Sequence, residues 1–177
     1  RGTSTDLHSG VFGGAVANPA MVLAQILAQM KDRSGRVKIP GFYDDVQELS
    51  EQERAAWRAL PFNERQYRKN LGAPKLFGES GFSVLERVWA RPTFEVNGII
   101  GGFTGEGAKT VIPAVASAKV SMRLVPDQDP DTIAKLFEDY VRQVTPKTVE
   151  VTVTRMHGGK PWMTDFDNPF VQAAGRA

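Results

Sequence analysis

The clearest strand pattern in the chain lies at residues 115–125, which read VASAKVSMRLV. Small or apolar residues occupy every second position and alternate with polar or charged ones, which is the period of a strand with one buried face. The apolar set consists of Ala116, Ala118, Val120, Met122 and Leu124. Arg123 belongs to the other set, so we expect its side chain to face away from the core.

Two helices with one apolar face each are predicted on either side of this strand in the sequence. Each begins with a capping residue followed by proline, at Asn18-Pro19 and Asp129-Pro130, where the missing N–H of proline costs nothing. We expect the first helix to end at Ser34-Gly35. Apolar residues recur at spacings of three and four in both: Val22, Leu23, Ile26, Leu27 and Met30 in the first, and Ile133, Leu136, Phe137, Tyr140, Val141 and Val144 in the second.

Three further strands are predicted, at residues 3–8, at 94–100 with a turn at Asn97-Gly98, and at 148–156. The resulting order, β-α-β-β-α-β, indicates an α+β fold of the ferredoxin-like kind. We therefore expect a four-stranded antiparallel sheet with both helices on one face. The other face and any edge strand would be free for a partner.

A helical insertion is predicted between about residues 37 and 91, where short helical pieces are separated by Gly and Pro. Ser50 and Glu53 form a capping box ahead of a helix that ends near Leu60. Further pieces are expected at 63–71 and 82–90. The candidate core residues of the insertion are Phe42, Trp57, Leu60, Leu71, Leu85 and Trp89.

Composition narrows the classes of partner and site. The 177 residues include 22 Lys and Arg against 20 Asp and Glu, without a basic cluster suited to nucleic acid. The chain has no cysteine, which excludes disulfides, zinc–thiolate sites and a thiol nucleophile. No apolar run approaches the roughly 18 residues of a membrane span. We expect a soluble, cytoplasmic protein that contacts neither nucleic acid nor membrane.

The candidate functional residues sit at strand ends and in one loop. His8 and His157 each follow a predicted strand and adjoin glycines, which leave room for a ligand, although a surface or structural histidine fits the same placement. Thr110 ends the glycine-rich stretch 101–110, which lacks the G-K-[ST] order of a phosphate loop and is either a ligand-presenting loop or a plain turn. Arg123 could bind a carboxylate through two hydrogen bonds, or it could be an ordinary surface arginine.

Two other kinds of active site fit the residues poorly. Asp6, His8 and Ser9 supply the side chains of a serine triad, but they lie too close together on one strand to converge, and no G-x-S-x-G motif is present. Two histidines and scattered carboxylates give neither H-x-D nor H-E-x-x-H. We therefore expect no metal ligands in this chain.

Four motifs resemble, in their order, the lid domain of M20 metallopeptidases. They are DLHSG at 6–10, GAKTVIP at 107–113, SMRLVP at 121–126 and HGGKPW at 157–162. Gly13-Gly14 and Asn18-Pro19 belong to the same pattern. The carnosinase-like, cytosolic non-specific dipeptidases are the most similar group, and the resemblance covers essentially the whole chain, including the insertion.

The resemblance implies a lid, or dimerisation, domain of a dipeptidase whose separate catalytic domain binds two divalent metal ions, zinc or manganese. It implies a homodimer formed through the sheet edge and the first helix. His8 would stabilise the oxyanion in the partner's active site, and Thr110 would contact the same substrate. Arg123 and His157 would close over the dipeptide of their own subunit, with Arg123 on its terminal carboxylate. The chain alone would bind no metal and be inactive.

The resemblance also suggests the domain limits. Residues 1–164 are interpreted as the lid domain, and residues 165–177 as the start of a return to a catalytic domain outside the sequence. Two alternatives stay open: the lid of an amino-acid deacylase of the same superfamily, which typically lacks so long an insertion, and a non-enzymatic ferredoxin-like module for dimerisation or ligand binding.

Overall fold

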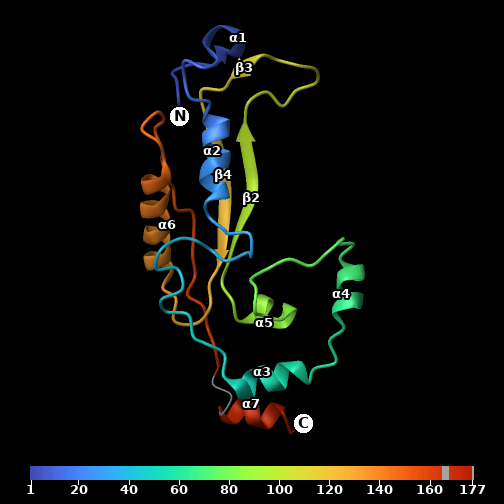
Figure 1. The fold of residues 1–177 in the computed structure, drawn as a ribbon. Helices are drawn as coiled ribbons and strands as arrows, with labels where there is room; N and C mark the ends of the chain where they lie inside the picture. The colour runs from blue at the N-terminus through green and yellow to red at the C-terminus, as the bar shows by residue number, and fades with distance from the viewer. Residues whose placement is uncertain (165–167, 177) are drawn as a thin grey trace.

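The computed structural model describes residues 1–164 and 168–176. The predicted return segment therefore falls partly outside the described residues, which take in its helix α7 (Pro169–Ala174). The central element is an antiparallel pair of strands, β2 (Thr93–Gly101) and β4 (Ala116–Arg123). Helices α2 (Pro19–Ala28) and α6 (Pro130–Val144) run beside this pair (Figure 1). The mixed helix and strand content is as expected.

One hydrophobic core lies where α2, α6 and the inward side chains of β2 and β4 meet. Met30 and Phe42 are its largest fully buried side chains, and Phe94 is 2% exposed. The alternation predicted for β4 is confirmed, since Val120 and Met122 pack against the core while Arg123 is exposed. The apolar stripe predicted for α6 packs on the same core. Each large side chain buried in this way contributes about 1.5–3 kcal/mol.

The helix starts agree with the predicted caps, but the end of the first helix does not. Asn18 Oδ1 accepts the Ala20 N–H at 2.9 Å, and Asp129 Oδ1 accepts two N–H groups of α6. Helix α2 ends at Ala28, well before Ser34-Gly35. The reason lies in the residues that follow: Asp32 Oδ1 accepts the N–H groups of Ser34 and Arg36, and such local bonds compete with a helix.

The predicted four-stranded sheet is not confirmed, because the described strands form two separate pairs. Strand β1 (Leu7–His8) pairs with β3 (Val111–Ile112), apart from the β2–β4 pair. Residues 148–156 form no strand. Arg1 and Glu150 exchange backbone hydrogen bonds of 2.7 and 2.8 Å, but the next N–H, that of Gly2, turns to the Ala114 carbonyl. The pairing therefore stops after one residue on each side.

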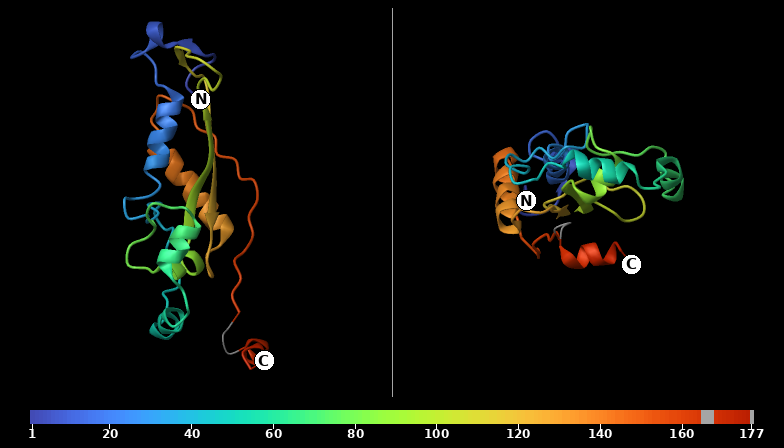
Figure 2. Two further views of the ribbon diagram at one scale, coloured as in Figure 1. Left: turned by 90° about the vertical axis from the view of Figure 1, so that its right-hand side faces the viewer. Right: turned by 90° about the horizontal axis from the view of Figure 1, so that it is seen from below.

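The burial pattern predicted for residues 148–156 is nevertheless present. Val149, Val151 and Val153 pack against the core, while Glu150 and Thr152 are exposed. The segment thus lies on the core through its side chains without a hydrogen-bonded ladder. Figure 2 shows it running along the molecule toward α7.

Strand β2 also differs from the prediction. The expected turn at Asn97-Gly98 is a β-bulge within one continuous strand, since Val96 faces Val120 and Gly98 faces Lys119. Asn97 is the extra residue of the bulge. Beyond it, Ile99 and Ile100 are 61% and 66% exposed.

The insertion consists of α3 (Glu51–Arg58), α4 (Glu64–Asn70) and α5 (Val84–Trp89), which lie beyond one end of the β2–β4 pair (Figure 1). Its predicted core is wrong in part. Leu60, Leu71 and Trp89 are 43%, 58% and 54% exposed, and Phe42 belongs to the main core instead. Helical spacing indicates only which residues share a face of a helix, and the described part of the chain does not close over these faces.

Ion pairs attach the insertion to the rest of the domain. The buried Glu79 carboxylate accepts two hydrogen bonds from Arg91, at 2.8 and 2.9 Å, and one from Arg36 at 2.7 Å. The Arg91 guanidinium also lies over the rings of Tyr43 and Phe82, 4.9 and 4.4 Å from their centroids. A buried carboxylate needs such partners because its desolvation is costly.

The Glu86 carboxylate caps α5 and makes the stability of the insertion depend on pH. Burial raises its pKa, but hydrogen bonds from the N–H and hydroxyl of Ser83 and the charge of Arg54 outweigh this, so the pKa lies below its ordinary value. The stabilisation is fully present above the unfolded pKa of about 4.3 and is lost as the pH falls through the folded-state value.

We therefore expect Glu86→Gln to lower the free energy of unfolding by about 1 kcal/mol at pH 7 and by much less at pH 3. Urea titrations at the two pH values measure the difference. Glu106→Gln, at an exposed loop position, is the matched control. An equal loss for Glu86→Gln at both pH values would show that the carboxylate charge contributes nothing.

Candidate functional site

His8 is held at the junction of β1 with a short helix that the sequence did not indicate, α1 (Ser9–Phe12). It is the N-cap residue of this helix, and its Nδ1 accepts the Gly10 N–H at 3.0 Å. A ring nitrogen that accepts a hydrogen bond carries no proton, so the proton of the neutral ring is on Nε2. The backbone of α1 thus sets the tautomer of His8.

The second ring nitrogen of His8 faces Thr110. His8 Nε2 lies 2.9 Å from Thr110 Oγ1, across 102 residues of sequence. With the proton on Nε2, the imidazole donates and the hydroxyl oxygen accepts. The pairing of His8 with Val111 and the bond from the Ser9 N–H to the Thr110 carbonyl, 3.1 Å, hold the two residues together. The structure therefore brings together two of the four predicted site residues.

Asp6 stabilises the pairing of β1 with β3 and does not form part of a triad. Its Oδ1 accepts the Ala114 N–H at 2.8 Å, which ties the start of β1 to the residues after β3. The Nδ1 position where a triad aspartate would bind is taken by Gly10. Asp6, His8 and Ser9 therefore do not assemble a serine-type catalytic site.

Arg123 and His157 lie toward the end of the β2–β4 pair that is remote from His8. Arg123 is the last residue of β4, whereas the first, Ala116, pairs with Gly101 at the end of the strand nearest β3 and α1 (Figure 1). His157 is next to Gly158, where an added Cβ would lie 3.5 Å from Pro130 Cβ, at the start of α6. Arg155 forms an ion pair with Asp131 there. Arg123 and His157 are both exposed.

Strand β4 separates the two pairs of predicted residues. It has eight residues, which at ~3.3 Å per residue extend over about 25 Å. His8 and Thr110 therefore cannot act within one chain on a ligand of dipeptide size that also touches Arg123.

The glycine-rich stretch that ends at Thr110 is an irregular loop that leads directly into β3. No helix follows it, so it lacks the strand-turn-helix setting of a phosphate site. Its role in the described structure is to deliver the Thr110 hydroxyl to His8.

The described residues do not offer a metal site. Among residues 1–164 and 168–176, no three His, Cys, Asp or Glu side chains gather closely enough to hold an ion. In the same part of the chain, no helix has both the length and the apolar character needed to cross a membrane.

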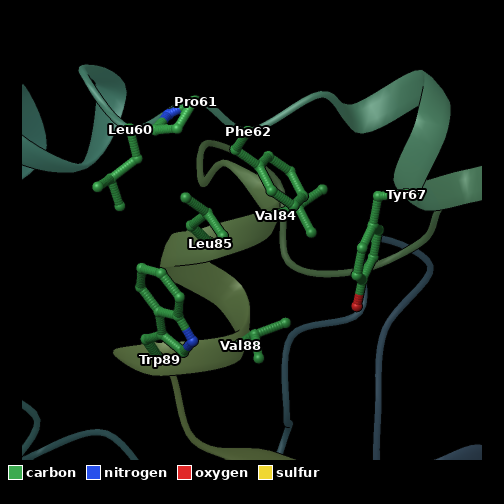
Figure 3. Close-up of a pocket in the computed structure, with 8 residues that line it drawn as sticks. All are labelled: Leu60, Pro61, Phe62, Tyr67, Val84, Leu85, Val88 and Trp89. Carbon is green, nitrogen blue, oxygen red and sulfur yellow. The ribbon is translucent and has the colours of Figure 1, made fainter.

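Two hollows lie in and beside the insertion, away from His8. The larger, of about 340 Å³, is lined by side chains of α5, the α3–α4 connection and Tyr67, none of them charged (Figure 3). The smaller, of about 210 Å³, is lined in part by Arg36, Arg54 and Arg91, whose guanidinium groups are paired with Glu79 and Glu86. Neither hollow combines a nucleophile, base or unpaired charge cluster with a binding cavity.

Removing the Asp6 carboxylate tests how firmly β1 is held to β3. We expect Asp6→Ala to lower stability by about 1 kcal/mol and to speed amide hydrogen exchange at Ala114 and Ser9, because one charge-assisted bond is lost. Exchange followed by NMR measures this. Asp45→Ala, at an exposed position, is the control and should leave these amides unchanged. Unchanged protection in Asp6→Ala would mean that the backbone pairing alone is sufficient.

Comparison with known proteins agrees with the four motifs. Residues 1–149 match the family model described as the peptidase dimerisation domain of M20 peptidases. The chain is 34% identical over 170 residues to the Cys-Gly metallodipeptidase dug1 of Schizosaccharomyces pombe, covering 94% of this chain and 36% of that protein. It is 32% identical over 175 residues to the human Beta-Ala-His dipeptidase, covering 97% of this chain and 34% of that protein.

The fold has a counterpart among solved structures. The crystal structure of human carnosine dipeptidase 1 matches 99% of this chain and 38% of that chain, with a TM-score of 0.83 and 31% identity. The chain thus spans about a third of the length of the relatives it matches. On the family match over residues 1–149 and these relatives, the chain belongs to the M20 peptidase dimerisation domain family.

Proposed function

We propose that this chain is the dimerisation and substrate-capping domain of a cytoplasmic, dinuclear metal-dependent dipeptidase, and that it donates His8 to the active site of a partner subunit. Residues 1–164 would form this domain. The observation that carries the proposal is the exposed His8 Nε2–H, fixed at a strand end about the length of β4 away from Arg123. The dipeptidase names of the relatives support the substrate class.

His8 would act as a hydrogen-bond donor to the oxyanion that forms when water attacks the scissile carbonyl. In the described structure the Nε2–H is directed at the Thr110 hydroxyl, which is itself a polar group able to contact substrate. When a substrate enters, its carbonyl oxygen would take the place of this hydroxyl at Nε2. A fixed donor of this kind typically accounts for a factor of about 10² to 10³ in rate.

Arg123 and His157 would act on the substrate of their own subunit. A guanidinium exposed at the end of β4 suits the terminal carboxylate of a dipeptide, which it can bind through two parallel hydrogen bonds. His157 would close over the same substrate from the segment beside α6. The separation of the two ends of β4 supports a site built from two subunits.

The metal ions would be held by a catalytic domain in the part of the relatives that this chain does not span. The described residues do not fit a metal ion, since they include no cluster of three candidate ligands. The two divalent ions, zinc or manganese, would activate the attacking water. The residues of this chain would bind and orient the dipeptide and stabilise the charge on the oxyanion. The chain by itself would be inactive.

A free strand edge supports the homodimer. Among the described residues, β2 pairs only with β4, which leaves its second edge open. Ile100 on this strand and Met21 on the neighbouring helix α2 are 66% and 63% exposed. An open edge beside exposed apolar side chains is a surface on which a second copy can pair. We propose that β2 and α2 form the dimer interface.

Mixing two inactive variants of the whole enzyme tests the arrangement of the site. His8→Ala and Arg123→Ala homodimers should each lose most of their kcat/KM for a dipeptide such as cysteinylglycine. In a heterodimer, one of the two sites combines an intact His8 from one subunit with an intact Arg123 from the other. Random mixing should therefore restore about a quarter of the wild-type activity. Hydrolysis is measured after subunit exchange.

The matched control is a mixture of His8→Ala with Thr110→Ala, which should restore no activity because both residues would come from the same lid.

Metal content should be unchanged in every variant, and loss of metal in His8→Ala would reassign His8 as a ligand. If His8→Ala with Arg123→Ala also restores nothing although heterodimers form, His8 does not act in trans. Activity on N-acyl amino acids but not dipeptides would favour a deacylase.

The interface prediction needs only the 177-residue chain. We expect Ile100→Lys to shift the chain from dimer to monomer in sedimentation velocity, because a lysine on the edge strand opposes pairing. Val88→Lys, at a residue 57% exposed on α5, is the control and should remain dimeric. A wild-type chain that sediments only as a monomer at high micromolar concentration would contradict self-sufficient dimerisation.

A further inference from the structure

The geometry points to Gly10 as the positioning residue for His8, through both its backbone N–H and its lack of a side chain. This inference rests on the proposed catalytic role of His8, and it adds a residue and a protonation state to that role. The N–H of Gly10 would keep Nδ1 unprotonated and leave the Nε2–H, which faces the Thr110 hydroxyl, as the donor. Gly10 itself touches neither substrate nor metal.

The hydrogen bond supports the first part of the inference. Gly10 is the second residue of α1, and its N–H donates to His8 Nδ1 at 3.0 Å. The first N–H groups of a helix have no partner within the helix and need an acceptor. His8 supplies one, as a serine or aspartate does at an ordinary N-cap. A proton on Nδ1 would place two donors face to face, so in this geometry Nδ1 accepts and carries no proton.

The contacts of the Gly10 Cα support the second part. A Cβ built on Gly10 would lie 2.9 Å from Cε1 and 3.2 Å from Nδ1 of His8. Real Cβ atoms do not approach ring atoms so closely, so any other residue would push the imidazole away from its position. Gly10 is not in the left-handed backbone region, unlike Gly14 with a φ of 86°. The reason for glycine here is therefore the room that the ring needs, not the backbone conformation.

These two constraints leave the imidazole little freedom. The backbone N–H fixes one nitrogen, the Thr110 hydroxyl contacts the other, and the bare Cα lets the ring lie against α1. An oxyanion donor is effective only if it is already in place when charge develops, and a misplacement of about 1 Å can cost a factor of about 10². Gly10 would thus influence turnover through His8 while leaving substrate affinity largely unchanged.

Kinetics of the whole enzyme test this role. We expect Gly10→Ala to lower kcat by about 10- to 100-fold with KM changed by less than about threefold, because the donor is displaced but substrate contacts remain. In the His8→Ala background the same change should have almost no further effect, since Gly10 acts through the imidazole. Ser9→Ala, at the adjacent position of α1, is the control and should retain wild-type kcat.

An equal loss from Gly10→Ala with and without His8 would overturn the inference, because it would reveal a general effect on folding. Subunit mixing gives a second readout: Gly10→Ala should be complemented by Arg123→Ala and not by His8→Ala. If His8→Ala itself leaves kcat unchanged, the proposed function is wrong. Gly10 would then still position the imidazole of His8, but this positioning would have no effect on catalysis.

NMR of the 177-residue chain tests the geometry independently of activity, since His8 and His157 are its only histidines. We expect a scalar coupling across the hydrogen bond between the Gly10 amide nitrogen and His8 Nδ1, and its loss in Gly10→Ala. Ser9→Ala should retain the coupling. Absence of the coupling in the wild-type chain, with His8 protonated at Nδ1, would refute the assigned tautomer.

Discussion

The register of β2 against β4 determines which side chains of the domain face the core and which face outward. Because side chains alternate along a strand, a shift of one residue would turn Val120 and Met122 outward and drive the Arg123 guanidinium into the core. Packing of the inward set against α2 and α6 prevents that shift. The bulge at Asn97 accommodates the extra residue of β2 without losing this alignment. The outward position of Arg123 thus follows from the burial of its neighbours.

The β2–β4 pair also separates two groups of polar residues, one at each end of the strands. At one end, the short pairing of β1 with β3 joins His8 to Thr110, and Asp6 reinforces it through the Ala114 N–H. At the other end, β4 stops at Arg123 and α6 starts beside the segment that carries His157. Strands β2 and β4 thus keep the two sets of polar residues about the length of β4 apart.

Local signals in the sequence predicted the regular elements well because caps and helical faces depend on near neighbours. The Asn18, Ser50 and Asp129 caps all form as expected, and so does the alternation of β4. The four motifs also identified the family, since their order along the chain is specific even where each motif is short. Most failures were features that depend on distant partners: the fourth strand at 148–156, the turn at Asn97 and the core of the insertion. The predicted end of the first helix failed for a local reason, since α2 stops at Ala28 and the hydrogen bonds accepted by Asp32 compete with further helix.

The sequence by itself therefore determined the helix starts, the outward face of β4, the absence of thiol chemistry and the residues worth testing, because each follows from residue type and spacing. Only the tertiary structure decided that Thr110 meets His8, that Gly10 occupies Nδ1 and that Arg123 lies at the opposite end. Those facts depend on a strand pairing that joins residues 102 positions apart. No local pattern encodes such a pairing. Bringing the two segments together costs chain entropy, and the free energy gained by packing the core offsets this cost only in the complete fold.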